Sequence, residues 1–142
     1  MTTSSRTTLG LVAGLTFVGL NSIWAQTPSP AGAQVYFINL KDGQEVKSPF
    51  LVQFGLSGIG VAPAGVEKPN TGHHHLLIDA GDSIPAGQIV PKDEQHKHFG
   101  KAQTSCDLTL TPGKHILTLQ LADGLHRSYG GKLAATITVT VK

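Results

Sequence analysis

The sequence predicts an all-β fold, an antiparallel β-sandwich of immunoglobulin-like architecture with about seven short strands. Apolar and polar residues alternate in several stretches, most clearly at residues 117–121 and 134–141. Glycines, prolines and aspartates of the kind found in turns separate these stretches. No stretch keeps the apolar spacing of a helix over a useful length. We therefore expect short strands joined by turns and loops.

The first strands are expected before and after a proline-containing bend. Residues 34–40 are β-branched and aromatic, and a turn-forming Asp-Gly pair follows them. Residues 50–56 place Phe50, Val52, Phe54 and Leu56 on one face of a strand. Glycine and proline dominate residues 57–72, which predicts a long loop. This loop leads into an expected strand at residues 73–79.

The second half of the chain continues in the same manner. Residues 83–94 contain glycine and two prolines and are expected to form a second long loop. A short extended segment follows at 96–99, and strands are expected at 104–110, 117–121 and 134–141. Long loops that are not of low complexity are often functional, so both loops are candidates for a binding site.

The N-terminal segment is expected to be removed. Arg6 gives a positive start, residues 9–20 are apolar and uncharged, and the segment ends in a small-residue cleavage site. We interpret residues 1–25 as a secretory signal peptide, because the apolar run is too short to span a membrane. The mature protein is thus expected to be periplasmic or secreted, with no membrane insertion after cleavage. Residues 26–33 are interpreted as a flexible leader, and residues 34–142 as a single β-sandwich domain.

Composition limits the partners. Loss of Arg6 leaves ten basic side chains against nine acidic ones. Such a balance gives no field that attracts nucleic acid, so no nucleic acid partner is expected. Cys106 is the only cysteine, so no intrachain disulfide can form. Its parity with Leu108 and Leu110 favours a buried, inert thiol over a copper ligand.

The histidines are the main functional signal. Five of the seven lie in two short segments, His73 to His75 and His96 to His98. Residues two apart in a strand point to the same face about 6.6 Å apart, so each segment offers a chelating pair. We predict a copper or zinc ion bound by His73, His75, His96 and His98 if the two segments approach each other.

Three further histidines are weaker candidates for the same site. His74 shares parity with Leu76 and Ile78 and is expected to be semi-buried, with its ring bonded to a backbone carbonyl. His115 precedes an apolar strand face and is more simply a structural residue. His126 lies beside a loop, where it is either a surface residue or completes the site.

The carboxylate of Asp79 and the lack of methionine in the mature chain also bear on the site. Asp79 ends the first histidine strand and either accepts a bond from a ligand histidine or caps a turn. The only methionine is the initiator, so the mature chain has no thioether for a copper(I) site.

Several motifs in a fixed order resemble the bacterial domain family of unknown function 4399 (DUF4399). They are NTGHHHLLID at 70–79, HKHFG at 96–100, QT at 103–104 and LTPGKH at 110–115, after an opening that runs from residue 35 to 65. The resemblance implies a small exported β-domain with histidine-rich motifs and no established reaction. The tail departs from the family pattern, in which a second histidine follows the one that matches His126.

The leading functional hypothesis is an exported histidine-rich domain that binds a transition-metal ion and takes part in periplasmic metal handling. The alternative is a structural or protein-interaction module of the cell envelope, with an envelope protein as partner and with histidines that only brace loops. No enzyme is expected, because the chain has no nucleophile elbow, phosphate-binding loop or metalloprotease helix motif. Activation of water by a bound metal is a third possibility.

Overall fold

The computed structural model describes residue 26 and residues 28–142. The proposed signal peptide, residues 1–25, lies outside the described residues. The described part contains nine β-strands and one 3-10 helix. In chain order these elements are β1 (Gln34–Phe37), β2 (Gln44–Val46), β3 (Phe50–Ser57), β4 (Gly60–Val61), β5 (Thr71–Ile78), β6 (His96–His98), β7 (Ser105–Leu108), β8 (Gly113–Ala122), η1 (Gly131–Leu133) and β9 (Ala134–Val141).

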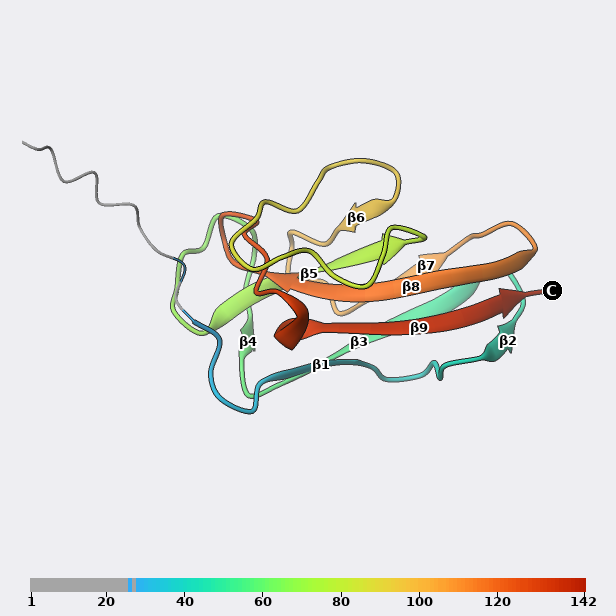
Figure 1. The fold of residues 1–142 in the computed structure, drawn as a ribbon, viewed down its shortest axis with the longest axis horizontal. Helices are drawn as coiled ribbons and strands as arrows, with labels where there is room; N and C mark the ends of the chain where they lie inside the picture. Colours follow the sequence, from blue (N-terminus) through green and yellow to red (C-terminus); the bar gives the residue numbers. More distant parts are fainter. Residues whose placement is uncertain (1–25, 27) are drawn as a thin grey trace, which may run out of the picture.

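The strands form two sheets, and the fold is all-β (Figure 1). One sheet has three strands in the order β1-β3-β7. The other has the order β2-β9-β8-β5-β4, with β6 paired to β5 beside that path. The sequence predicts about seven strands, and the additional ones, β2 and β4, contain three and two residues. Such short segments leave no alternation that a sequence pattern can reveal.

The smaller sheet is antiparallel as predicted, but the larger sheet is mixed, which corrects the predicted arrangement. β2 pairs with β9 in parallel, and β4 pairs with β5 in parallel. Antiparallel neighbours can be joined by a tight hairpin, whereas parallel neighbours need a longer connection. β2 and β9 lie at opposite ends of the domain sequence, and the loop between β4 and β5 is long enough to reverse the chain twice.

Both sheets contribute to one hydrophobic core. Val52 and Phe54 come from the smaller sheet, while Leu117, Leu119 and Val139 come from the larger one. β3 holds the smaller sheet together because its first half pairs with β7 and its second half with β1. Burial of these apolar side chains is the main stabilising contribution that the composition allows.

β5 is the strand that carries the three consecutive histidines. It lies between β8 on one side and β4 and β6 on the other. His74, Leu76 and Ile78 share the face that looks into the core, where Leu76 and Ile78 belong to the core cluster. His73, His75 and Leu77 therefore occupy the opposite face of the sheet.

Residues 79–95 fold back over that opposite face (Figure 1). The Gln120 side-chain oxygen accepts a hydrogen bond of 2.9 Å from the Ile84 backbone. The Thr118 hydroxyl donates to the Gly81 carbonyl at 2.8 Å, and the Ser128 hydroxyl donates to the Ile84 carbonyl at 2.7 Å. The loop is thus fastened to β8 and to the segment after it, and it encloses side chains that a single sheet would leave in water.

The described start of the leader also contacts the domain. The Gln26 side chain donates a 2.7 Å hydrogen bond to the Arg127 carbonyl. Among the described residues, no helix is both long and apolar enough to cross a membrane.

Candidate metal centre

His73 and His75 are fixed by their strand. Both lie on the face of β5 turned away from the core, and their exposed fractions are 0% and 1%. The register of β5 against β8 places them opposite Ala122 and Gln120. Because β5 has paired strands on both sides, the backbone beneath the two imidazoles is hydrogen-bonded throughout and holds them in place.

His98 reaches the same face from β6. In the antiparallel pair of β5 and β6, His98 lies directly opposite His75, and the two ring centroids are 5.2 Å apart. Gly100 leaves the space for this ring, since a β-carbon at Gly100 would collide with the His98 imidazole. The predicted approach of the two histidine segments is therefore a direct strand pairing.

His126 comes from the turn after β8. The Asp123 carboxylate accepts hydrogen bonds from the backbone of Leu125 at 2.9 Å and of Arg127 at 3.0 Å. It also pairs with the Arg127 side chain at 2.8 Å. His126 itself has a φ of 64°, a conformation uncommon for a residue with a side chain. The Asp123 bonds thus hold a strained turn that directs His126 toward β5.

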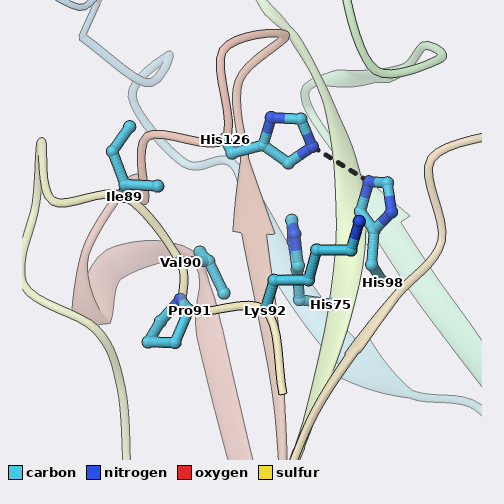
Figure 2. Close-up of a pocket in the computed structure, with 7 residues that line it drawn as sticks. All are labelled: His75, Ile89, Val90, Pro91, Lys92, His98 and His126. Carbon is cyan, nitrogen blue, oxygen red and sulfur yellow. Dashed lines mark hydrogen bonds between the residues drawn. The ribbon is translucent and has the colours of Figure 1, made fainter.

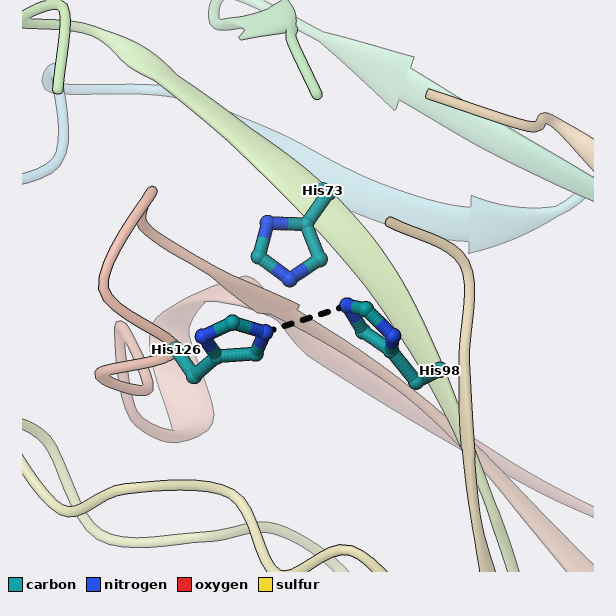
Figure 3. Close-up of side chains that lie close together, drawn as sticks. All are labelled: His73, His98 and His126. Carbon is teal, nitrogen blue, oxygen red and sulfur yellow. Dashed lines mark hydrogen bonds between the residues drawn. The ribbon is translucent and has the colours of Figure 1, made fainter. Parts of the chain in front are cut away.

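Three imidazoles converge closely at this point (Figure 3). One nitrogen each from His73, His98 and His126 lies within 4.8 Å of the other two. The Nε2 atoms of His98 and His126 are 3.1 Å apart, so a ring that carries its proton on Nε2 donates to the other. These three histidines come from three separate segments of the chain.

His75 is the fourth member of the cluster. Its ring centroid lies 4.7 Å from that of His73, 5.2 Å from that of His98 and 6.0 Å from that of His126. Figure 2 shows His75, His98 and His126 around a common space. We define the histidine cluster as His73, His75, His98 and His126.

Several nitrogens of the cluster are buried without a hydrogen-bond partner. They are both ring nitrogens of His73 and the Nδ1 atom of His75. A buried polar group without a partner costs about 1 to 3 kcal/mol. A neutral imidazole has a free lone pair on one nitrogen and a proton on the other. A metal ion bound to one nitrogen of each ring would therefore remove part of that cost.

His73, His75 and His98 favour the neutral imidazole, which is the form that binds metals. Burial lowers the pKa of His73 to about 4, and the neighbouring His126 and His98 act in the same direction. Burial and the same kind of like-charge neighbours lower the pKa of His75 to about 2. The pKa of His98 is also lowered, first by burial and then by His126 and Lys92.

His74 lies outside the cluster, on the core face of β5. Its ring packs against Phe54 with centroids 5.2 Å apart, and burial lowers its pKa to about 4. It is fully buried rather than semi-buried, and the expected bond to a backbone carbonyl is wrong, because neither ring nitrogen has a partner. The aromatic surroundings explain this, since the Phe54 ring lies against His74 where a carbonyl was expected.

The predicted pair of His96 and His98 is divided. His96 lies opposite Leu77 in the strand register, and its Nδ1 atom is 2.6 Å from the Asp93 carboxylate. His96 therefore lies on the same sheet face as His98, but it is two residues earlier on β6, away from the cluster. Its ring has its own carboxylate partner, Asp93. The correction follows from the register, because β6 pairs with β5 so that only His98 meets His75.

Asp79 and His115 lie together at the far end of β5. The His115 Nδ1 atom is 2.8 Å from Asp79 Oδ2, and its Nε2 atom is 2.9 Å from the Thr111 carbonyl. The pKa of His115 is raised, chiefly by the hydrogen bond to Asp79. Asp79 also accepts a 2.7 Å bond from the Ile116 backbone. The carboxylate thus serves His115 and the β8 backbone, and it does not hold a ring of the histidine cluster.

Cys106 packs beside the core on β7. It is partly buried, and burial raises the pKa of its thiol to about 11. At neutral pH the side chain is therefore a protonated thiol, which is a poor metal ligand.

Two residues that matter to the cluster were not among those predicted from the sequence. Asp123 forms the turn that directs His126, and Lys92 lies beside His75 and His98 (Figure 2). The Asp-Gly pair at 123–124 is a turn signal two residues before His126, and it could have drawn attention to Asp123. No local pattern distinguishes Lys92 from other loop lysines.

Comparison with known proteins supports the family resemblance. The model of a family described as a domain of unknown function (DUF4399) matches residues 52–142. The match includes β5, β6 and the turn that carries His126, and so all four residues of the histidine cluster. Neither a search of curated proteins nor a search of solved structures gave a significant match.

Proposed function

The chain belongs to the DUF4399 family, and from its histidine cluster we propose that it is an exported protein that binds a transition-metal ion, copper or zinc. The ligands are His73, His75, His98 and His126. The single observation that carries the proposal is the convergence of one nitrogen each from His73, His98 and His126 within 4.8 Å of one another. The ring of His75 lies beside them, and His73 and His75 are buried with ring nitrogens that have no hydrogen-bond partner.

The spacing of the cluster agrees with one shared ion. Two nitrogens bound to a tetrahedral zinc ion at about 2.0 to 2.1 Å lie roughly 3.3 Å apart. The Nε2 atoms of His98 and His126 are 3.1 Å apart. Ring centroids of two such ligands lie roughly 5.2 Å apart, and those of the cluster are separated by 4.7 to 6.0 Å. Small rotations of the rings would complete the coordination.

The donor set favours copper(II) or zinc. Imidazole nitrogen suits both ions, and copper(II) binds more tightly in the general order of affinities. Cys106 is held as a thiol and lies in the other sheet, and the mature chain has no methionine. A copper(I) site of the thioether type is therefore not proposed.

The proposed setting is the periplasm or the cell exterior, where the protein would sequester or carry metal. This part of the proposal rests on the signal-peptide pattern of residues 1–25. We also propose that the two sheets stack as an immunoglobulin-like sandwich, which is supported by a core drawn from both sheets. The proposed role is binding rather than catalysis.

A metal titration with matched variants tests the proposal. The mature protein without a tag is titrated with copper(II) and with zinc, and so is a variant with His98→Gln and His126→Gln. Because two ligands are lost, the affinity is expected to fall by about 100-fold or more. The control variant carries His96→Gln and His115→Gln, which removes two imidazoles outside the cluster, and it should bind as tightly as the unchanged protein.

The outcome separates the two functional hypotheses. Weak binding that the cluster variant leaves unchanged would contradict the metal proposal and favour a structural module whose histidines brace the loops. An equal loss of affinity in both variants would show that metal binds to histidines without using the cluster. Circular dichroism of all three proteins verifies that each variant is folded.

A further inference from the structure

The histidine cluster opens on a cavity of about 280 Å³. Figure 2 shows its lining, which comes from β5, β6, the turn after β8 and the loop over the sheet. The lining residues are His75, Ile89, Val90, Pro91, Lys92, His98 and His126. Ligand pockets usually start at about 300 Å³, so this volume suits a small molecule.

The cavity lies on the solvent-accessible side of the histidine cluster, next to the position proposed for the metal ion. His75, His98 and His126 belong both to the cluster and to the cavity lining. His73 is not part of the lining and approaches from the buried side. A ligand in the cavity could therefore reach a metal ion without displacing His73.

Lys92 adds a positive charge at the same cavity. Its ammonium group extends toward His98 in Figure 2, and its charge contributes to the lowered pKa of His98. No hydrogen bond or ion pair of Lys92 is found among the described residues. A divalent ion and an ammonium group across a small cavity repel each other unless an anion lies between them.

The opposite wall of the cavity is apolar. Ile89, Val90 and Pro91 precede Lys92 in the loop, and Val90 is buried with 4% of its surface exposed. The backbone of Val90 donates a 2.9 Å hydrogen bond to the His126 carbonyl, which fixes this wall against the cluster. The cavity thus offers two positive groups at one end and aliphatic surface at the other.

From this arrangement we propose that the metal-loaded protein binds a small aliphatic monocarboxylate in the cavity. The carboxylate bridges the metal ion and the Lys92 ammonium group, and the aliphatic tail lies on Ile89, Val90 and Pro91. This inference rests on the proposed metal function and adds a second ligand to it.

The test uses the copper(II)-loaded mature protein. Butyrate and formate are titrated in turn, and binding is followed by the ligand-field absorption and the electron paramagnetic resonance spectrum of the copper ion. Butyrate is expected to bind roughly tenfold more tightly than formate, because its alkyl chain moves from water onto the apolar wall of the cavity. The Lys92→Met variant should keep its copper and lose roughly tenfold in butyrate affinity, because the charged partner is gone.

Lys97→Met is the matched control. Lys97 lies next to His98 on β6, and strand alternation turns it to the other face of the sheet. The Lys97→Met variant also removes one positive charge near His98, but from outside the cavity, so its butyrate affinity should stay unchanged.

The remaining outcomes distinguish a failure of the metal site from a failure of the carboxylate site. Failure to bind either copper(II) or zinc in the first titration overturns the metal function and this inference with it. Tight copper binding without a spectral response to butyrate overturns the carboxylate site alone. Equal butyrate affinities of the Lys92→Met and Lys97→Met proteins, or equal affinities for butyrate and formate, would also overturn it.

Discussion

The two ends of β5 lie beside histidines in opposite environments. At the start of the strand, His73 and His75 are buried among other imidazoles, and burial lowers their pKa values. At the far end, His115 lies against the Asp79 carboxylate, which raises its pKa. His96, near that end, is likewise bonded to a carboxylate, that of Asp93.

The difference lies in the available partners rather than in the residue type. A carboxylate partner stabilises the protonated imidazole and satisfies its N–H groups, so the ring has little left to offer a metal. Imidazoles that face only each other stay neutral and keep lone pairs available. The presence of a carboxylate thus distinguishes a structural histidine from a candidate ligand in this chain.

The largest expected effect is the acid sensitivity of the metal-free protein. The folded-state pKa values of His73, His74 and His75 lie below the usual 6.5, at about 4, 4 and 2. The unfolded chain therefore takes up protons first as the pH falls below 6.5. Stability from these neutral histidines is complete above pH 6.5 and is lost toward pH 4, with each contributing up to about 1.4 kcal/mol per pH unit.

Urea unfolding between pH 7 and pH 4 measures this loss. The His74→Leu variant removes one of the three titrating groups from the core face of β5, so its stability should fall less steeply with acid. An identical slope for the variant and the unchanged protein would show that His74 is not held neutral by the fold.

The next effect concerns the carboxylates at the two ends. Asp123→Asn weakens the turn that directs His126 and removes a negative charge that acts on His73. We expect metal affinity to fall about tenfold or more, as for other residues that orient ligands. Asp79→Asn makes the same chemical change at the other end and should leave metal affinity unchanged. Metal titration of both variants tests the comparison, and similar losses in the two would contradict it.

A smaller effect is expected at Gly100. A methyl group at this position collides with the His98 imidazole, so Gly100→Ala should displace the ring from the cluster. Because His98 is exposed and can rotate, we expect a reduction of only a few-fold in metal affinity. Gly131→Ala serves as the control, because Gly131 has no positive φ and an added methyl group would meet the Ser83 hydroxyl only at 3.6 Å, an ordinary contact distance. Gly113 is unsuitable as a control, although the space around it is open, because its positive φ would strain an alanine. A loss of the same size in the control would exclude a specific contact with His98.

The smallest effect belongs to the His115 and Asp79 pair. The raised pKa of His115 means that its contribution to stability is complete below pH 6.5 and is lost as the pH rises through its folded-state value. For a pair near the surface the contribution is about 0.5 kcal/mol. His115→Gln should thus be less stable than the unchanged protein at pH 6, with a smaller difference at pH 9. Unfolding curves at the two pH values measure it, and a larger difference at pH 9 would reverse the assigned sign.

Much of the strand pattern was predictable from alternation. The stretch at 50–56 corresponds to β3 (Phe50–Ser57), and that at 134–141 corresponds to β9 (Ala134–Val141). Here apolar side chains on one face pack into the core, so the period of two is visible in the sequence. β2 and β4 were not predictable because their two or three residues are defined by the strand they pair with.

The sequence by itself determined that His73 and His75 share one face of a strand, because side chains alternate along it. Only the tertiary structure decided which other histidines join them. The register of β6 brings His98 opposite His75 and leaves His96 beside Leu77, and the Asp123 turn brings in His126 from far along the chain. The physical reason is that side-chain direction within a strand is a local property, whereas strand register and loop position depend on contacts between distant segments.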